Sequence, residues 1–392
     1  MSNRMICLVA DSLGIGALPD AADFGDLGAD TLGHTARFVG GIRLPNLEKL
    51  GLGHLGDFQG IKKLNAPIGV VARLGEKSPA KDTMTGHWEM AGVITQEPFP
   101  IFPKGFPPEL IQSFISRSQV PGILGNLPAS GTTIIDELGE EHLRTLKPIV
   151  YTSGDSVFQI AAHEKAFGLK RLYEICEMAR ELTLPYQIAR VIARPFVGES
   201  VGSFKRTENR RDYSMSPPPN ALDDLKAHGV DVYSVGKIED IFAHRGVCFS
   251  NHTGNNLSSL RATEAFIDQA KDRPSFIFVN LVDFDMLYGH RRDPKGYATA
   301  LEGLDAFLPR LIQKLGVGDG LMLTADHGCD PTYRGTDHTR EYVPMVGYFP
   351  GLSGQVLADR SSFADIGKTV LDWFKTPSQI QIGSPLVCVP KR

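Results

Sequence analysis

Short apolar runs alternate along this chain with polar turns and with longer stretches of helical character. The most apolar runs, which are long enough to form buried strands, span residues 5–10, 275–282, 321–324 and 343–349. A run with little polar alternation is typical of a central strand in a parallel sheet that helices cover on both faces. The pattern therefore predicts an α/β fold with a central, mainly parallel sheet flanked by helices.

Weaker signals complete the expected elements. Further strands are expected over residues 70–74, 148–152, 186–193 and 230–235. Helices are expected after Asp30 and over residues 45–50, 109–116, 164–182, 222–228, 238–243, 257–271, 297–314 and 364–374. We identify no internal repeat that would divide the chain into similar units.

The pattern changes after about residue 95, where two proline-rich segments interrupt it. Residues 99–108 hold four prolines, and three more follow directly after Ser216. Such segments are typical of crossings between domains. We therefore expect a smaller α/β domain, residues 96–218, inserted between the two halves of one core, residues 1–95 and 219–392.

Composition restricts the class of protein. A chain of 392 residues is long for a single core, and its net charge of −4 argues against a nucleic-acid partner. No apolar stretch reaches the roughly 20 residues of a membrane-spanning helix, so no membrane partner is expected. The cysteines are scattered, which predicts a reduced, cytoplasmic protein; they are Cys7, Cys176, Cys248, Cys329 and Cys388. The sequence leaves the oligomeric state open, a monomer included.

Acidic residues, two of them with histidine, follow three of the apolar runs. The residues in question are Asp11, then Asp285 with His290, then Asp326 with His327, and His338 on the next loop. Open α/β sheets place their sites at the carboxyl ends of strands, so we expect these side chains to meet. Three carboxylates and three imidazoles can hold two divalent cations that clamp a phosphoryl group. Such a mixed set admits zinc, manganese or magnesium.

A bound cation would also stabilise an alkoxide, which makes an alcohol nucleophile a natural partner. The candidate hydroxyls are those of Thr83, Thr85, Ser12 and Thr31. Thr83 lies in a polar stretch beside Lys81 and Asp82, which is also typical of a capped helix start where a phosphate could bind. Spacing alone does not choose among the four.

Several long motifs resemble a known family. They are Asp11-Ser12, Lys81–Glu89, Val282–Asp293, Ala325–Gly328 and Gly335–Pro344. Together they resemble the bacterial phosphopentomutase family of the alkaline phosphatase superfamily, over nearly the whole chain and including the insertion. The resemblance implies an alkaline-phosphatase-like core with an inserted cap domain that binds substrate. It also implies interconversion of ribose or deoxyribose 1-phosphate and 5-phosphate through a phosphothreonine enzyme and a pentose 1,5-bisphosphate.

The same resemblance implies roles for the metal ligands and the nucleophile. Asp11, Asp326 and His327, with the Thr83 oxygen, would hold one metal, and Asp285, His290 and His338 would hold the other. Thr83 would be the catalytic nucleophile. The family uses two Mn²⁺ ions, with other divalent cations possible. The implied activator is a sugar bisphosphate, such as glucose 1,6-bisphosphate or ribose 1,5-bisphosphate.

Substrate contacts are implied for the insertion. Ser153, Asp155, Arg190 and Arg206 lie in stretches similar to those that hold the pentose phosphate in the family, and Lys237 would reach the ligand from the core. A basic cap suits a mutase, because a second phosphate needs recognition away from the metals and water must be excluded.

Three other functions compete with this interpretation. A metal-dependent phosphatase of the same superfamily would share the metal chemistry but would release phosphate. A cofactor-independent phosphoglycerate mutase would share the architecture but would use a serine nucleophile. A non-catalytic metal- or phosphate-binding module would make the ligand set incidental.

Overall fold

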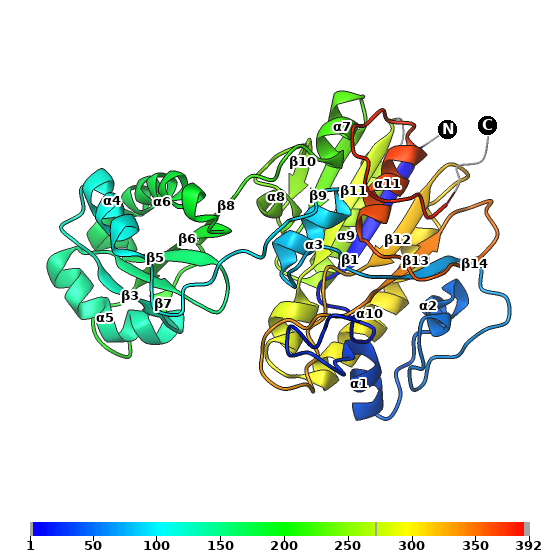
Figure 1. Ribbon diagram of the computed structural model, residues 1–392, viewed down its shortest axis with the longest axis horizontal. Coiled ribbons are helices and arrows are strands. Elements are labelled where there is room, and N and C mark those ends of the chain that lie inside the picture. The colour runs from blue at the N-terminus through cyan, green and yellow to red at the C-terminus, as the bar shows by residue number, and fades with distance from the viewer. Residues whose placement is uncertain (1–2, 271–272, 388–392) are drawn as a thin grey trace. The chain divides into compact units, whose positions relative to one another are not determined.

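Internal contacts divide the chain into two compact units in the computed structural model, which describes residues 3–270 and 273–387 (Figure 1). The core unit comprises Met1–Pro98 and Pro217–Arg392, and the insert comprises Phe99–Ser216. Each unit has its own sheet. The substrate-binding role expected for the insert stays a prediction.

The core unit is built on an eight-stranded sheet with the order β10-β9-β11-β1-β12-β13-β2-β14. The strands are β1 (Arg4–Ala10), β2 (Val70–Leu74), β9 (Asp231–Val235), β10 (Phe249–Asn251), β11 (Ser275–Leu281), β12 (Gly320–Thr324), β13 (Val343–Tyr348) and β14 (Gln355–Val356). Only β13 runs against its neighbours β12 and β2, while every other pairing is parallel. The predicted mainly parallel α/β fold is confirmed.

Helices flank this sheet (Figure 1). They are α1 (Thr31–Phe38), α2 (Pro45–Leu50), α3 (Thr83–Met90), α7 (Ala221–Ala227), α8 (Ile238–Ile241), α9 (Asn256–Gln269), α10 (Pro294–Ile312) and α11 (Ala364–Trp373). Every residue of β1, β11 and β12 is buried. Full burial on both faces explains why these three strands read as apolar runs rather than as alternating patterns.

The insert contains a second, six-stranded sheet of order β3-β4-β5-β6-β7, with β8 paired to β6. Its elements are β3 (Leu124–Pro128), β4 (Ile149–Thr152), β5 (Val157–His163), β6 (Arg190–Val197), β7 (Lys205–Arg206), β8 (Arg211–Ser214), α4 (Pro108–Ser118), α5 (Gly131–Thr145) and α6 (Leu169–Thr183). Phe114, Phe158 and Leu172 belong to its own apolar core. The insert therefore has the sheet, helices and core of a domain.

Three details of the insert correct the expectations from sequence. The strand expected at residues 186–193 begins only at Arg190, because Leu184–Tyr186 forms a helical turn and Gln187 has φ of 51°. The helix expected from Glu164 becomes regular only at Leu169, after Gly168 with φ of 93°. Helix α5 and strands β3, β5, β7 and β8 are not among the expected elements.

Two residues named in the sequence analysis, Lys271 and Cys388, lie outside the described residues. The helix expected over 257–271 is α9, which ends at Gln269. The four cysteines other than Cys388 form no disulfide. Among the described residues, no helix is long and apolar enough to cross a membrane.

The core segments that precede and follow the insert are hydrogen-bonded to each other within the core unit. The chain leaves the core unit after Pro98 and returns at Pro217. Near these points the backbone N–H of Ala221 donates to the carbonyl oxygen of Ala91 at 2.9 Å. The two halves of the core unit are thus tied together where the insertion interrupts them.

A buried ion pair joins the starts of β1 and β12. Arg4 Nη2 lies 2.7 Å from Asp319 Oδ2, and the Arg4 backbone N–H donates to Asp319 Oδ1 at 2.9 Å. Arg4 Nη1 also donates to the Ile267 carbonyl oxygen at 2.6 Å. Burial acts to raise the pKa of Asp319, and the hydrogen bonds from Arg4 act to lower it. The lowering is the larger effect, so the pKa of Asp319 lies below its usual range.

We expect Asp319→Ala to lower the free energy of unfolding by about 3–5 kcal/mol, because it leaves a buried guanidinium unpaired. Since the folded-state pKa is depressed, this stabilisation is complete above roughly pH 4 and is lost as the pH falls through the folded-state value. Urea unfolding across this pH range measures both effects. Asp268→Ala, at a half-exposed residue that pairs with Lys314, is the control and should cost less than about 1 kcal/mol.

Candidate active site

The carboxyl ends of β11, β1 and β12 bring three aspartates to one edge of the core sheet. Ala10 pairs with Leu281, and Val9 pairs with Thr324, so the three adjacent strands end at the same level. Asp11, Asp285 and Asp326 follow these strand ends. All three are buried, with 0%, 5% and 0% of their surface exposed.

His327 lies at the centre of a first group of oxygen atoms. Its Nε2 atom is 3.6 Å from Asp11 Oδ1, 3.4 Å from Asp326 Oδ2 and 3.2 Å from the hydroxyl of Thr83. The Asp11, Asp326 and His327 ligand atoms lie within 4.8 Å of one another. This spacing suits a shared cation.

Asp285 lies at the centre of a second group. Its Oδ1 is 3.4 Å from His338 Nε2, its Oδ2 is 3.2 Å from His290 Nε2, and the two Nε2 atoms are 3.2 Å apart. The rings of His327 and His338 stack with centroids 3.8 Å apart, so the two groups are adjacent. The structure thus brings all six predicted ligands into one cluster.

The histidine rings are oriented as metal ligands usually are. In all three, Nδ1 faces a backbone carbonyl oxygen: that of Gly328 for His327 at 3.1 Å, Thr336 for His290 at 2.7 Å and Lys81 for His338 at 2.9 Å. A proton on Nδ1 satisfies that contact and leaves the Nε2 lone pair facing the cluster. Backbone support of this kind fixes the tautomer that binds a metal.

The carboxylates of the cluster also leave room for a cation. One buried oxygen of each faces an imidazole nitrogen, at 3.6 Å for Asp11 Oδ1, 3.4 Å for Asp285 Oδ1 and 3.2 Å for Asp326 Oδ2, but makes no hydrogen bond of regular geometry among the described residues. Burial, together with the negative charges of Asp326 and Asp285, raises the pKa of Asp11 to about 7. Unpaired oxygens beside imidazole nitrogens fit a divalent cation.

The second group neutralises itself in part when no cation is bound. Burial lowers the pKa of His290, but its contact with Asp285 raises it to about 12. Burial raises the pKa of Asp285, and the charges and hydrogen bonds of His338 and His290 bring it well below its usual range. Burial lowers the pKa of His327 to about 4, so this imidazole is neutral at pH 7.

The structure distinguishes the four candidate hydroxyls. Thr83 is half-buried and touches His327 in the cluster. The other three form hydrogen bonds elsewhere: Ser12 with Tyr297 at 3.2 Å, Thr31 with Glu341 at 2.7 Å and Thr85 with Asp82 at 2.6 Å. Thr83 is also the first residue of α3, which Asp82 caps by accepting from the Thr85 N–H at 3.1 Å.

A buried arginine ties the Thr83 segment to the loop of His338. Arg340 Nη1 lies 2.7 Å from Glu76 Oε2 and donates to the Ser78 carbonyl oxygen at 2.7 Å. Its side chain is only 2% exposed. These bonds, with that of His338 to Lys81, fix the position of both segments relative to the cluster.

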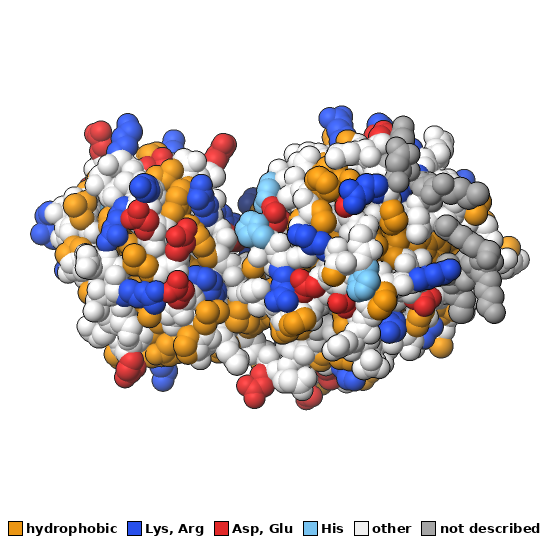
Figure 2. All heavy atoms as spheres, turned by 90° about the horizontal axis from the view of Figure 1, so that it is seen from above, with side chains coloured by type: hydrophobic (Ala, Val, Ile, Leu, Met, Phe, Trp, Pro, Cys, Tyr) orange, Lys and Arg blue, Asp and Glu red, His pale blue; other side chains and the backbone are white. Residues whose placement is uncertain are grey.

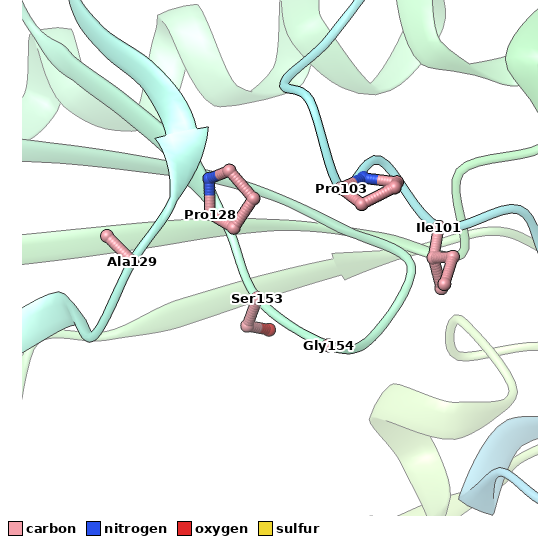
Figure 3. A pocket seen from close by; sticks show the side chains of 6 residues that line it. All are labelled: Ile101, Pro103, Pro128, Ala129, Ser153 and Gly154. Atoms are coloured by element: carbon pink, nitrogen blue, oxygen red, sulfur yellow. The ribbon is translucent and has the colours of Figure 1, made fainter.

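The expected substrate contacts of the insert fall into two places. Ser153 lines a pocket of about 430 Å³ together with Gly154 and Pro128 (Figure 3). Arg190 lies 3.9 Å from Asp155. Gly154 of the pocket thus directly precedes Asp155 of the ion pair in the chain.

Arg206 and Lys237 are placed differently. Arg206 donates to the Tyr151 hydroxyl at 3.1 Å. On the face drawn in Figure 2, acidic and basic side chains are mixed over the insert rather than gathered by sign. Lys237 belongs to the core unit, directly before α8, and its charge acts to lower the pKa of Asp11. Lys237 is therefore within electrostatic reach of the acidic cluster.

Sequence analysis passed over two buried polar residues at the cluster. Asn280 Nδ2 donates to Asp11 Oδ2 at 3.0 Å, and His87 Nδ1 lies 3.2 Å from Asp326 Oδ2. Asn280 is an amide within the apolar strand β11, and His87 lies inside the motif Lys81–Glu89. A lone amide in a fully buried strand is the signal that could have drawn attention to Asn280.

Comparisons with known proteins agree with this fold and site. The sequence model of the metalloenzyme superfamily matches residues 3–378. The solved structure of Leishmania mexicana phosphoglycerate mutase shares 11% identity and a TM-score of 0.51, over 99% of this chain and 98% of that one. The PH0037 protein from Pyrococcus horikoshii shares 14% identity and a TM-score of 0.50, over 98% and 100%. These two show the fold, and the chain is of the metalloenzyme class.

Sequence relatives define the group more narrowly. Phosphopentomutase from Anaeromyxobacter dehalogenans (strain 2CP-C) is 54% identical over 378 residues, which cover 96% of both chains. Phosphopentomutase from Symbiobacterium thermophilum is 54% identical over 376 residues, or 95% of both. The chain belongs to the phosphopentomutase family, whose members are intramolecular phosphotransferases.

We expect removal of divalent cations with EDTA to lower the unfolding temperature, because Asp11, Asp285 and Asp326 then repel one another without a counter-ion. Mn²⁺ at about 100 times its Kd should restore about 2.7 kcal/mol. Thermal unfolding with and without Mn²⁺ measures this.

Asp11→Asn is the matched control. It removes one of the repelling charges, so the metal-free variant should gain on the order of 1 kcal/mol, while Mn²⁺ stabilises it less than the wild type. An unfolding temperature that is insensitive to EDTA and Mn²⁺ in the wild type would contradict the metal assignment.

Proposed function

We propose that this enzyme interconverts ribose or deoxyribose 1-phosphate and 5-phosphate by passing phosphate through Thr83. The names of its relatives support the reaction. The observation that carries the residue assignment is the position of the Thr83 hydroxyl, 3.2 Å from His327 Nε2 inside the cluster. We further propose a cytoplasmic location, which the four unpaired cysteines support.

Two ligand sets divide the cluster in this proposal. Asp11, Asp326 and His327, with the Thr83 oxygen, hold one cation, and Asp285, His290 and His338 hold the other. We propose that both are Mn²⁺. When bound, the ions favour the ionised Thr83 oxygen and neutralise phosphoryl charge. The partial positive charge at the N-terminus of α3, which begins at Thr83, adds to this neutralisation.

The cycle begins with Thr83 phosphorylated. The free sugar hydroxyl attacks phosphorus, the bond from phosphorus to Thr83 Oγ1 breaks, and the proton that the sugar loses is restored to Thr83. The resulting pentose 1,5-bisphosphate then returns its other phosphate to Thr83, which gives the isomeric monophosphate and the starting enzyme. A sugar bisphosphate primes unphosphorylated enzyme by the same step, which is why we propose one as activator.

The insert holds the pentose phosphate in this proposal. Arg190 is three-quarters buried, and its guanidinium group lies 3.9 Å from Asp155 and 3.7 Å from Asp212. A guanidinium group held in this way presents several donors in a planar arrangement that matches a phosphate. Ser153, Asp155 and Arg206 are the other proposed contacts from the insert. Lys237 is the proposed contact from the core unit.

Thr83→Ala should abolish mutase activity, because it removes the only hydroxyl of the four candidates that lies in the cluster. Thr83→Ser should retain part of the activity, since the oxygen remains. Glucose 1,6-bisphosphate should add one phosphate to the Thr83 peptide of the wild type, as read by mass spectrometry.

Thr85→Ala is the control and should leave this labelling intact. Phosphate on Thr85 or Ser12, or turnover without Thr83, would contradict the assignment. A coloured assay for inorganic phosphate separates the mutase from a phosphatase, which would release phosphate continuously.

Arg190→Ala and Arg206→Ala should each weaken kcat/KM for ribose 5-phosphate by about 2–5 kcal/mol, because a charged phosphate contact is lost. Arg117→Ala, at an exposed arginine of the insert that pairs with Glu181, should leave the kinetics unchanged. Unchanged kinetics in both test variants would show that neither arginine contacts the substrate phosphate.

A further inference from the structure

Helix α3 carries a second polar side chain at the cluster, one turn after Thr83. His87 is 0% exposed, and both of its ring nitrogens face polar atoms. Nδ1 lies 2.8 Å from the carbonyl oxygen of Thr83 and 3.2 Å from Asp326 Oδ2. Nε2 lies 3.4 Å from Asn280 Nδ2. A single imidazole thus contacts the proposed nucleophile's backbone, one proposed metal ligand and the amide that holds another.

The hydrogen-bond pattern fixes which nitrogen carries the proton. Asn280 donates through Nδ2 to Asp11 Oδ2 at 3.0 Å, since its carbonyl oxygen would be repelled there. The same NH₂ group faces His87 Nε2, which is therefore the acceptor. The proton then lies on Nδ1, between the Thr83 carbonyl oxygen and the Asp326 carboxylate.

The neighbouring glycine shows how closely α3 approaches Asp326. A Cβ atom on Gly86 would lie 2.2 Å from the Asp326 carbonyl oxygen, so only glycine fits there. Gly86 and His87 therefore hold α3 directly against Asp326, one by contact and the other by polar bonding. A helix this close transmits any tilt to the Thr83 hydroxyl.

We propose that His87, supported by Asn280, is a positioning residue that aligns Thr83 with the carboxylates of Asp11 and Asp326 so that all three face the same cation. This inference rests on the proposed function. His87 touches neither the Thr83 hydroxyl nor a reacting atom; it acts through the Thr83 carbonyl group, through Asp326 and, by way of Asn280, through Asp11.

Two variants of His87 test the roles of its two ring nitrogens separately. The amide nitrogen of asparagine takes the place of the Nδ1 donor, and the amide oxygen of glutamine takes the place of the Nε2 acceptor. His87→Asn keeps a donor toward Thr83 and Asp326, so its Kd for Mn²⁺ should stay within about threefold of the wild type. His87→Gln can still accept from the Asn280 amide through its carbonyl oxygen but loses the Nδ1 donor toward Thr83 and Asp326, so its Kd should rise about 10- to 100-fold.

The measurement is titration of the metal-free, full-length protein with Mn²⁺, followed by electron paramagnetic resonance or calorimetry. At saturating Mn²⁺, His87→Gln should also lower kcat about 10-fold or more and leave KM for ribose 5-phosphate within about twofold, because the proposed substrate contacts are intact. A merely structural histidine would not produce this difference between the two variants.

His142→Gln is the matched control. His142 is also 0% exposed, its Nδ1 lies 2.7 Å from the Lys147 carbonyl oxygen, and its Nε2 accepts from the His163 N–H at 2.9 Å. This variant should lose stability but keep the wild-type Kd for Mn²⁺. Equal Mn²⁺ affinities for His87→Asn and His87→Gln, or an equal loss in His142→Gln, would overturn the proposal. Turnover that survives Thr83→Ala would instead overturn the proposed function and leave the Mn²⁺ comparison standing.

Discussion

Mutual repulsion among three buried carboxylates is the constraint on which the site depends. Asp11, Asp285 and Asp326 each leave one oxygen without a hydrogen bond of regular geometry among the described residues, and burial raises the energy of their charges. Beside these carboxylates, the Nδ1 atoms of three imidazoles face backbone carbonyl oxygens, so their Nε2 atoms face the cluster. The buried carboxylates lower the stability of the metal-free protein and raise its affinity for cations. The same charges therefore destabilise the empty site and determine that its ligand is a cation.

Backbone geometry beside Asp11 contributes to the same arrangement. Ser12 has φ of 77°, a left-handed conformation that is unusual for a residue other than glycine. In this conformation its N–H donates to Asp326 Oδ1 at 3.0 Å. The bond holds one oxygen of Asp326 and leaves Oδ2 for the cluster. Local strain at this turn is thus linked to the orientation of a proposed metal ligand.

The sequence predicted best those strands in which every residue is buried. Strands β1, β11 and β12 are buried throughout, so an apolar run was sufficient evidence. The cluster followed, since strand ends in an open sheet meet. Strand β3 was missed because, after Leu124, its residues are mostly exposed and give no clear pattern.

Contacts between distant segments were beyond sequence analysis. Arg340 reaches the carbonyl oxygens of Ser78 and Ala80, and His87 reaches Asn280 on β11, which is almost two hundred positions away in the chain. Neither contact has a local pattern. Spacing in the sequence could not choose Thr83 over Thr85 or Ser12, and only the family resemblance indicated it, because the choice depends on which hydroxyl faces His327 in the folded chain.

The hydrogen bond from Ala221 to Ala91 has a consequence for how such a chain could evolve. These two residues of the core unit lie on either side of the insertion and are in contact, so a short connection between their segments would close the core chain. Under the proposed function, in which the insert binds the substrate, exchanging the insert for a different module would change the substrate without changing the strands that carry the aspartates. The metal cluster and the proposed substrate-binding domain could then change independently in evolution.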